Sequence, residues 1–191
     1  MNTNVKRLAV SAMLIALSLA LNELLKFDLT FVQGGSVTFF SMVPLCLIGW
    51  VWGVPWGLAC GAIMGTLDML LGGLGNFAWV SGAVAYLMLI LFDYVIAYAC
   101  IGTAGILRGR IKNDTLAFAL GAGAACFLRF VCHFITGVTI WRDLTSDMLS
   151  SVIYSVTYNG AYMLPELIIT AIGCAAVVNV RPLMRELDKK L

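Results

Sequence analysis

Charged residues and prolines are scarce in this chain of 191 amino acids. Only 12% of the residues are Asp, Glu, Lys or Arg and only four are proline, whereas 61% are hydrophobic and the mean hydropathy is +0.96. A soluble domain of this size usually carries about twice that fraction of charge. The deficit excludes an ordinary soluble domain, and the chain contains no linker, internal repeat or low-complexity tract.

Residues and motifs of common catalytic and metal sites are also scarce. The chain has a single histidine, His133, and neither an HExxH nor a Walker A motif. Its six cysteines include no pair at CxxC spacing and all lie in apolar segments, which favours small buried side chains over metal or disulfide chemistry. We therefore expect no catalytic residue, no metal, no cofactor and no nucleic-acid partner, and any ATP hydrolysis has to come from another chain.

Apolar stretches of about 20 residues, in contrast, recur along the whole length, and each is long enough to cross a bilayer. We predict an all-α integral membrane protein with one domain, residues 1–191, and six transmembrane helices. Turn-forming segments at residues 33–36, 53–55, 72–76 and 142–147 separate the spans. The expected spans are residues 5–25, 36–52, 54–71, 79–107, 115–138 and 151–179.

The basic residues predict the orientation of these spans. Nine of the 12 Lys and Arg residues lie in the N-terminal segment, in the loop between the fourth and fifth spans, and at the C-terminus. An even number of spans puts these three segments on one side of the membrane, and the positive-inside bias makes that side the cytoplasm. Both termini are therefore expected in the cytoplasm, whereas five or seven spans would scatter the basic clusters.

Apart from Lys6, Arg7 and Glu23 near the ends of the first span, five ionisable side chains lie within the expected spans. Each costs roughly 2.5–3.5 kcal/mol at a helix centre and usually marks a site or a mutual pair. In the expected topology the polar groups converge on the outer half of the bundle. Three carboxylates face one arginine and one histidine, so the set is negative whatever the charge of the histidine. Such a pocket favours a cation, to which nearby aromatic side chains can add cation–π contacts. The five are Asp68, Asp93, Arg129, His133 and Glu166.

Each polar residue also has an interpretation in terms of ordinary packing. Arg129 and Asp93 can pair to hold two helices together, and His133 can be a satisfied interhelical hydrogen-bonding residue. Trp141, at the end of a span, fits an interfacial aromatic belt, and Asn159 can help helices to pack. Packing does not explain why these residues share one depth in the membrane.

Four stretches of sequence are more specific. On them the chain resembles the thiamine-specific substrate-binding subunits (S-components) of energy-coupling factor transporters, and the similarity covers nearly all six spans. The resemblance implies a bacterial cytoplasmic-membrane protein that captures thiamine from outside the cell, and whose partners are a transmembrane coupling subunit and two ATPase subunits. The stretches are QGGSVTFFSMVP (33–44), FDYVIAYACIG (92–102), LRFVCHFITGVTIW (128–141) and IYSVTYNGAYMLPELIITAI (153–172).

The resemblance also implies a set of thiamine-binding residues. The acid of the family's fourth helix falls on Asp93, which would engage the aminopyrimidine, and Trp141 would stack on a ring of the ligand. Some members have glutamate at the position of Asp93, and some carry a tryptophan before the second helix, where this chain has only Gly34 and Gly35. The implied set is Asp93, Tyr94, Arg129, His133, Gly137, Trp141, Tyr154 and Asn159.

A stripe of small residues runs along one face of the first span. Ala12, Ala16 and Ala20 are spaced four apart, which permits close approach of another helix. Spacing alone is equally consistent with packing inside the bundle and with docking of a partner. The resemblance implies docking of the transmembrane coupling subunit.

Two other classes of protein stay open. A self-sufficient proton-coupled carrier for a small organic cation would use Asp93, His133 and Glu166 as a relay, although no inverted repeat is visible in the sequence. An intramembrane enzyme with paired aspartates would require Asp68 and Asp93 to meet.

Overall fold

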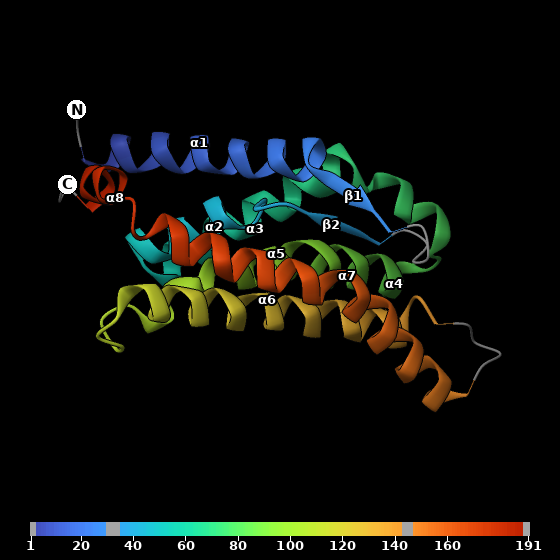
Figure 1. Cartoon of the computed structure of the whole chain (residues 1–191). Coiled ribbons are helices and arrows are strands. Elements are labelled where there is room, and N and C mark those ends of the chain that lie inside the picture. Colours follow the sequence, from blue (N-terminus) through green and yellow to red (C-terminus); the bar gives the residue numbers. More distant parts are fainter. Residues whose placement is uncertain (1–2, 30–34, 143–146, 189–191) are drawn as a thin grey trace.

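The structure, a computed structural model, describes residues 3–29, 35–142 and 147–188, and shows a bundle of long helices (Figure 1). Helix α1 (Thr3–Leu24) leads into a hairpin of two short antiparallel strands, β1 (Lys26–Asp28) and β2 (Ser36–Thr38). The remaining elements are α2 (Val43–Trp52), α3 (Val54–Leu71), η1 (Gly73–Trp79), α4 (Ala83–Met88), η2 (Leu89–Val95), α5 (Ile96–Ile101), η3 (Gly102–Leu107), α6 (Asp114–Thr139), α7 (Met148–Val177) and α8 (Arg181–Asp188). Elements η1 and η3 are 3-10 helices, and η2 is a π-helix.

Within the described residues, five helices are long and apolar enough to cross a membrane, which confirms an all-α membrane protein. The predicted third span has the bounds of α3, and the predicted first, fifth and sixth spans correspond to α1, α6 and α7. The five are Asn4–Leu24, Val54–Leu71, Ala83–Leu107, Asp114–Thr139 and Met148–Val177.

The prediction of a helical span over residues 36–52 is wrong for its first part, because the helix α2 begins only at Val43. Ser36–Thr38 pairs with Lys26–Asp28 as a strand. Phe40 has a φ of 59°, in the left-handed region that a right-handed helix cannot contain. Pro44, in the first turn of α2, favours a helix start at this point. The ten residues of α2 are about 15 Å long, half the thickness of a bilayer core.

The sequence predicts the fourth span over residues 79–107. In the structure its helix begins at Ala83, four residues after the predicted start, and consists of α4, η2, α5 and η3 in succession. Its π-helical part contains Asp93 and Tyr94, which are 9% and 6% exposed. Successive residues of a helix point about 100° apart. Asp93 and Tyr94 can therefore both be buried only if other elements pack on two different sides of this helix. A π-helical segment within an α-helix frequently accompanies a functional site.

Glycines bring this composite helix against α3 at backbone distance. A Cβ atom on Gly61 would lie 2.4 Å from the carbonyl oxygen of Tyr98, and one on Gly65 would lie 2.3 Å from that of Tyr94. Real Cβ atoms do not approach a backbone oxygen so closely. The two glycines therefore determine where the side chains of Tyr94 and Tyr98 stand relative to α3.

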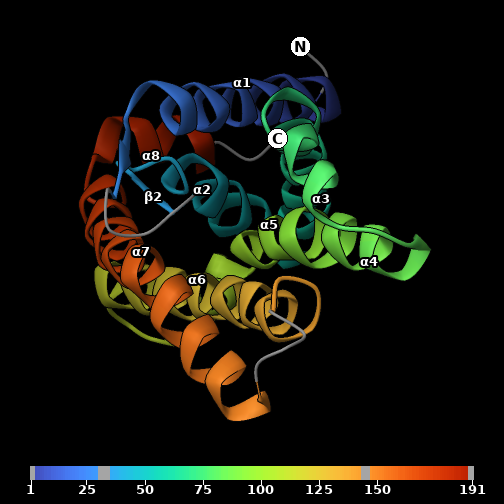
Figure 2. The ribbon, with the colours of Figure 1, turned by 90° about the vertical axis from the view of Figure 1, so that its right-hand side faces the viewer.

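Helix α2 lies inside the ring that the other helices form when the bundle is seen end-on (Figure 2). Every residue of α2 from Pro44 to Trp50 is buried, and Leu45 and Ile48 are fully enclosed. The Trp50 ring stacks on Phe118 of α6 with the ring centroids 4.5 Å apart. Apolar burial of this kind removes side chains from lipid or water and holds the bundle around α2.

Both ends of the described chain lie at the same end of the bundle, next to α8, and the strands extend toward the opposite end (Figure 1). The ammonium of Lys6 lies 3.3 Å from the Glu186 carboxylate and ties α1 to α8. Parts of the predicted turns at 33–36 and 142–147 lie outside the described residues, as do Lys189 and Lys190.

Candidate functional site

Asp93, on η2, accepts hydrogen bonds from side chains of the α6 region, and we call this group the Asp93 cluster. Trp141 Nε1 donates to Asp93 Oδ2 at 2.8 Å, and the Thr136 hydroxyl donates to Oδ1. His133 Nδ1 lies 3.2 Å from the same Oδ1. Thr136 and Gly137 come three and four residues after His133 on α6, so the three lie on one face of the helix. Trp141, four residues after Gly137, continues this face just beyond the helix end. The structure thus unites three residues of the predicted set: Asp93, His133 and Trp141.

His133 retains an unused hydrogen-bonding atom. Its Nε2 is buried and has no hydrogen-bond partner within residues 3–29, 35–142 and 147–188. Buried polar atoms without a partner are rare in native proteins and call for an explanation. The imidazole therefore has one nitrogen next to Asp93, and its second nitrogen has no partner among the described residues.

Helix α7 completes the cluster from the other side. Asn159 Nδ2 donates to the carbonyl oxygen of His133 at 3.3 Å and to that of Ser155 at 3.0 Å. The Tyr162 hydroxyl donates to Asn159 Oδ1 at 2.8 Å. A Cβ atom on Gly137 would lie 2.1 Å from the Ser155 hydroxyl oxygen, so only glycine permits this contact between α6 and α7.

Tyr154 lies at the exposed end of a row of tyrosines on α7. Its side chain is 56% exposed, and its ring is 5.6 Å from that of Tyr158 in a stacked arrangement. Tyr158 in turn meets Tyr162 edge-on at 5.8 Å. The three tyrosines form a row along α7 that connects the exposed Tyr154 to the Asp93 cluster through Asn159.

Arg129 pairs with Glu166, not with Asp93 as one interpretation of the sequence had it. Arg129 Nη1 lies 2.8 Å from Glu166 Oε2, and the two side chains are 11% and 5% exposed. The Thr38 hydroxyl donates to the other oxygen of Glu166, so that β2 joins the pair. The guanidinium also lies 4.7 Å from the centre of the Tyr98 ring. Each charge of this pair is therefore compensated within the protein.

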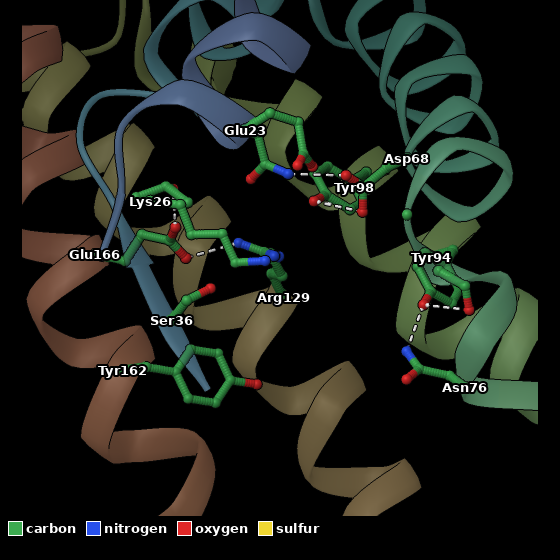
Figure 3. A pocket seen from close by; sticks show the side chains of 14 residues that line it. Glu23, Lys26, Ser36, Asp68, Asn76, Tyr94, Tyr98, Arg129, Tyr162 and Glu166 are labelled. Atoms are coloured by element: carbon green, nitrogen blue, oxygen red, sulfur yellow. Dashed lines mark hydrogen bonds and ion pairs between the residues drawn. The ribbon is translucent and has the colours of Figure 1, made fainter. Parts of the chain in front are cut away.

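Other side chains surround a polar cavity of about 410 Å³ (Figure 3). Figure 3 shows Glu166 and Lys26 on one side and Asp68 with Tyr98 on the other, with Arg129 between them. Of the predicted thiamine-binding set, Tyr94 and Arg129 line the cavity. The described lining residues are Asn22, Glu23, Lys26, Ser36, Thr38, Asp68, Gly72, Gly73, Asn76, Tyr94, Tyr98, Arg129, Tyr162 and Glu166.

Tyr94 faces away from Asp93, toward α3 and η1. Its hydroxyl lies 2.7 Å from Asn76 Nδ2, which donates to it, and donates to the Gly73 carbonyl oxygen at 3.3 Å. Asp68 does not meet Asp93, since it accepts from Asn22 at 2.9 Å and from the Tyr98 hydroxyl at 3.0 Å. The paired aspartates that an intramembrane enzyme would need are therefore apart.

Several site residues escaped the sequence-based reasoning. Thr136 had a usable signal, because it lies three residues after His133 on the same helical face. Thr38 and Tyr162 carried no such signal in the sequence. Their contacts with Glu166 and Asn159 depend on how the hairpin and the helices pack.

The alanine stripe on α1 faces outward. Ala12, Ala16 and Ala20 are exposed, whereas Ser11 and Ser18 on the opposite face are buried. The Ser18 hydroxyl donates to the carbonyl oxygen of Ser41, just before α2. In the described structure this stripe is therefore not part of the contact between α1 and the rest of the bundle.

Comparisons with known proteins agree with one another. A family described as "Thiamine transporter protein" matches residues 8–185. The thiamine transporter ThiT of Bacillus subtilis (strain 168) is 30% identical over 192 residues, which cover 96% of this chain and 95% of that protein. The thiamine transporter ThiT of Lacticaseibacillus paracasei is 25% identical over 153 residues, 75% of this chain and 73% of that protein.

A solved structure of ThiT from Listeria monocytogenes has the same fold. It matches with a TM-score of 0.71 at 17% identity, over 96% of this chain and 98% of that one. The curated relatives are named as transporters, which confirms the expectation of a role other than that of an enzyme. The apolar membrane helices and the match over residues 8–185 lead to one conclusion: this chain is a multi-pass bacterial membrane protein that belongs to the thiamine transporter family.

Proposed function

We propose that this chain is the thiamine-binding subunit of an energy-coupling factor importer, and that the Asp93 cluster holds the ligand. The observation that carries the proposal is the buried carboxylate of Asp93 between the Trp141 indole and His133, whose Nε2 has no partner among the described residues. Thiamine combines an aminopyrimidine, which donates hydrogen bonds, with a cationic thiazolium. A buried acceptor beside aromatic faces suits both parts.

The balance of charge supports a cationic ligand. Arg129 and Glu166 cancel one another at 2.8 Å. Asp68 and Asp93 remain, and their described hydrogen-bond donors are neutral apart from His133, which is charged only when protonated. The interior of the site therefore carries net negative charge, which a thiazolium cation would offset.

We assign to the chain one helical domain with six crossings of the membrane and both termini in the cytoplasm. Residues 36–52 supply the second crossing, since they lead from the hairpin at one end of the bundle to the start of α3 at the other. The Arg108 guanidinium donates to the Trp50 carbonyl oxygen at 2.8 Å and so brings the basic loop before α6 to the inner end of α2. Basic residues at the end that also holds the termini support a cytoplasmic assignment of this end.

The assigned orientation opens the site to the outside. Trp141 lies beyond the end of α6, and the first turns of α7 lie at the end of the bundle opposite the two termini. The ligand would thus be captured from outside the cell in the outer half of the bundle. Delivery to the cytoplasm would need a transmembrane coupling subunit and two ATPase subunits, because this chain has no nucleotide-binding motif.

Helix α1 supplies the face for the coupling subunit in this proposal. Ala12, Ala16 and Ala20 are exposed, so a partner helix can approach the α1 backbone closely. The opposite face of α1 packs on the bundle through Ile15 and Ser18. Docking on the outer face would leave the Asp93 cluster untouched.

Two measurements test the proposal. Calorimetric titration of the purified chain should show tight binding of thiamine without ATP, with quenching of tryptophan fluorescence as Trp141 stacks on the ligand. Binding of another vitamin but not of thiamine would refute the ligand assignment. In reconstituted vesicles, uptake should require the coupling and ATPase subunits; uptake driven by a proton gradient with this chain alone would establish a self-sufficient carrier instead.

A further inference from the structure

Helix α8 lies across the end of the bundle that holds both termini. Figure 1 shows it end-on, whereas α1, α6 and α7 are seen along their length. Two of its side chains, Met184 and Leu187, are buried in the apolar core. Arg181 and Arg185, four residues apart and therefore on one side of the helix, are exposed. A helix with separate apolar and basic sides that lies across membrane-spanning helices is typical of the membrane–water interface.

Contacts with the first turns of α1 place α8 at the level of the lipid headgroups. The ammonium of Lys6 lies 3.3 Å from the Glu186 carboxylate and donates to the Glu186 carbonyl oxygen at 3.2 Å. The guanidinium of the next residue, Arg7, lies 3.8 Å from the centre of the Trp56 ring, in the first turn of α3. Tryptophan at the end of a membrane helix is enriched at the interface between hydrocarbon and water. Helix α8 therefore lies next to this interface.

The two arginines of α8 have charges that the protein does not compensate. Arg181 and Arg185 form no hydrogen bond or ion pair within the part of the chain that the structure describes. The acid beside them on α8, Glu186, is engaged by Lys6. Both guanidinium groups are therefore available to an anionic partner outside the chain.

The loop before α6 adds positive charge at the same end of the bundle. Arg110 and Lys112 are exposed in this loop, and Asp114 is the exposed acid that follows them. The Asn179 amide donates to the Thr115 hydroxyl at 3.0 Å and so holds the start of α6 beside the turn that leads into α8. The exposed charges described at this end are mainly positive, which complements an anionic surface.

We propose that α8 binds the headgroups of anionic phospholipids, with Arg181 and Arg185 as the residues that contact the phosphates. The planar fork of a guanidinium matches the geometry of two phosphate oxygens. Headgroups surround a membrane-spanning bundle at the level of α8, so this partner is always within reach of the two arginines. The inference concerns the lipid around the chain and does not depend on the ligand of the Asp93 cluster.

Native mass spectrometry of the detergent-solubilised full-length chain, titrated with phosphatidylglycerol or with phosphatidylcholine, tests this proposal. The wild type should bind phosphatidylglycerol about tenfold or more tightly than phosphatidylcholine. A basic residue near an anionic lipid surface contributes roughly fivefold in affinity, so the pair Arg181→Gln and Arg185→Gln should reduce this preference by about tenfold or more. The pair Arg181→Lys and Arg185→Lys keeps both charges and should retain most of the preference. As a matched control, Lys26→Gln with Arg142→Gln removes two positive charges at the opposite end and should leave the preference unchanged.

Three outcomes would overturn the proposal. The first is equal affinity of the wild type for the two lipids, or a preference that the glutamine pair on α8 leaves intact. The second is an equal loss in the control pair, because net charge and not α8 would then determine lipid binding. The third is an α8 glutamine pair that keeps the lipid preference but no longer co-purifies with the coupling subunit, which would assign this surface to a protein partner. Thiamine titration of the same variants should give the wild-type affinity, because α8 and the Asp93 cluster lie at opposite ends of the bundle.

Discussion

Replacement of Asp93 by asparagine removes the charge at the centre of the cluster and changes its volume little. In the structure the carboxylate accepts from the Trp141 indole at 2.8 Å and from the Thr136 hydroxyl. An asparagine has one acceptor oxygen, so it can retain one of these contacts and turns an amide donor toward the other. The variant therefore tests the charge and the second acceptor of Asp93 together, in a packed environment that remains filled.

The expected loss follows from the strength of a hydrogen bond to a charged, buried acceptor. Such a contact is worth about 1.5–3 kcal/mol, which corresponds to roughly ten- to hundredfold in the dissociation constant. Asp93→Asn should weaken thiamine by this factor. A neutral analogue, in which an uncharged ring replaces the thiazolium, keeps the aminopyrimidine and loses the same hydrogen bond. Its binding should therefore weaken less than that of thiamine, because only the cation also loses its attraction to the negative charge.

Paired titrations provide the assay: calorimetry with thiamine and with the neutral analogue, and thermal unfolding of the same detergent-solubilised variant. Equal weakening of both ligands would show that the charge itself plays no part in recognition. Unchanged binding with a lower melting temperature would refute the claim that Asp93 contacts thiamine, because Asp93 would then serve only to hold η2 against α6.

Three further predictions test neighbouring elements. Thr136→Val removes one donor to Asp93 at nearly constant volume and should weaken thiamine several-fold, about 1 kcal/mol, in the same titration, whereas Thr136→Ser should restore binding; equal affinities in both variants would contradict a positioning role. Glu166→Gln leaves the buried charge of Arg129 without its counter-ion and should cost about 3–5 kcal/mol of stability, measured by thermal or denaturant unfolding; an unchanged melting temperature would show that the pair is not needed. Ala16→Trp should preserve thiamine binding by the isolated chain but abolish co-purification with the coupling subunit and ATP-driven uptake; normal uptake would remove α1 from the docking role, and loss of binding would place the stripe in internal packing.

Local sequence properties were sufficient for most of the membrane helices. The apolar runs and the glycine and proline residues between them predict α3 within its observed bounds, and α6 and α7 within a few residues, because hydropathy and turn chemistry are properties of neighbouring residues. Helical spacing likewise put His133 and Gly137 on one face of α6, and the resemblance to a known family joined that face to Asp93. These parts of the site needed no knowledge of how the helices pack.

The partners of the charged residues depended on the packed bundle. Arg129 forms its ion pair with Glu166 and not with Asp93. Asp68 accepts hydrogen bonds from Asn22 and Tyr98. The sequence alone was consistent with several other pairings. Which side chains meet is determined by the rotation and the relative height of each helix, and these follow from contacts such as that of Gly65 with the Tyr94 backbone, between residues distant in sequence. The composition of the chain determined that buried charges would need partners. The identity of these partners, and the position of the polar cavity left between them, follow from the packing of the helices, because they depend on distances between helices and not on spacing along one helix.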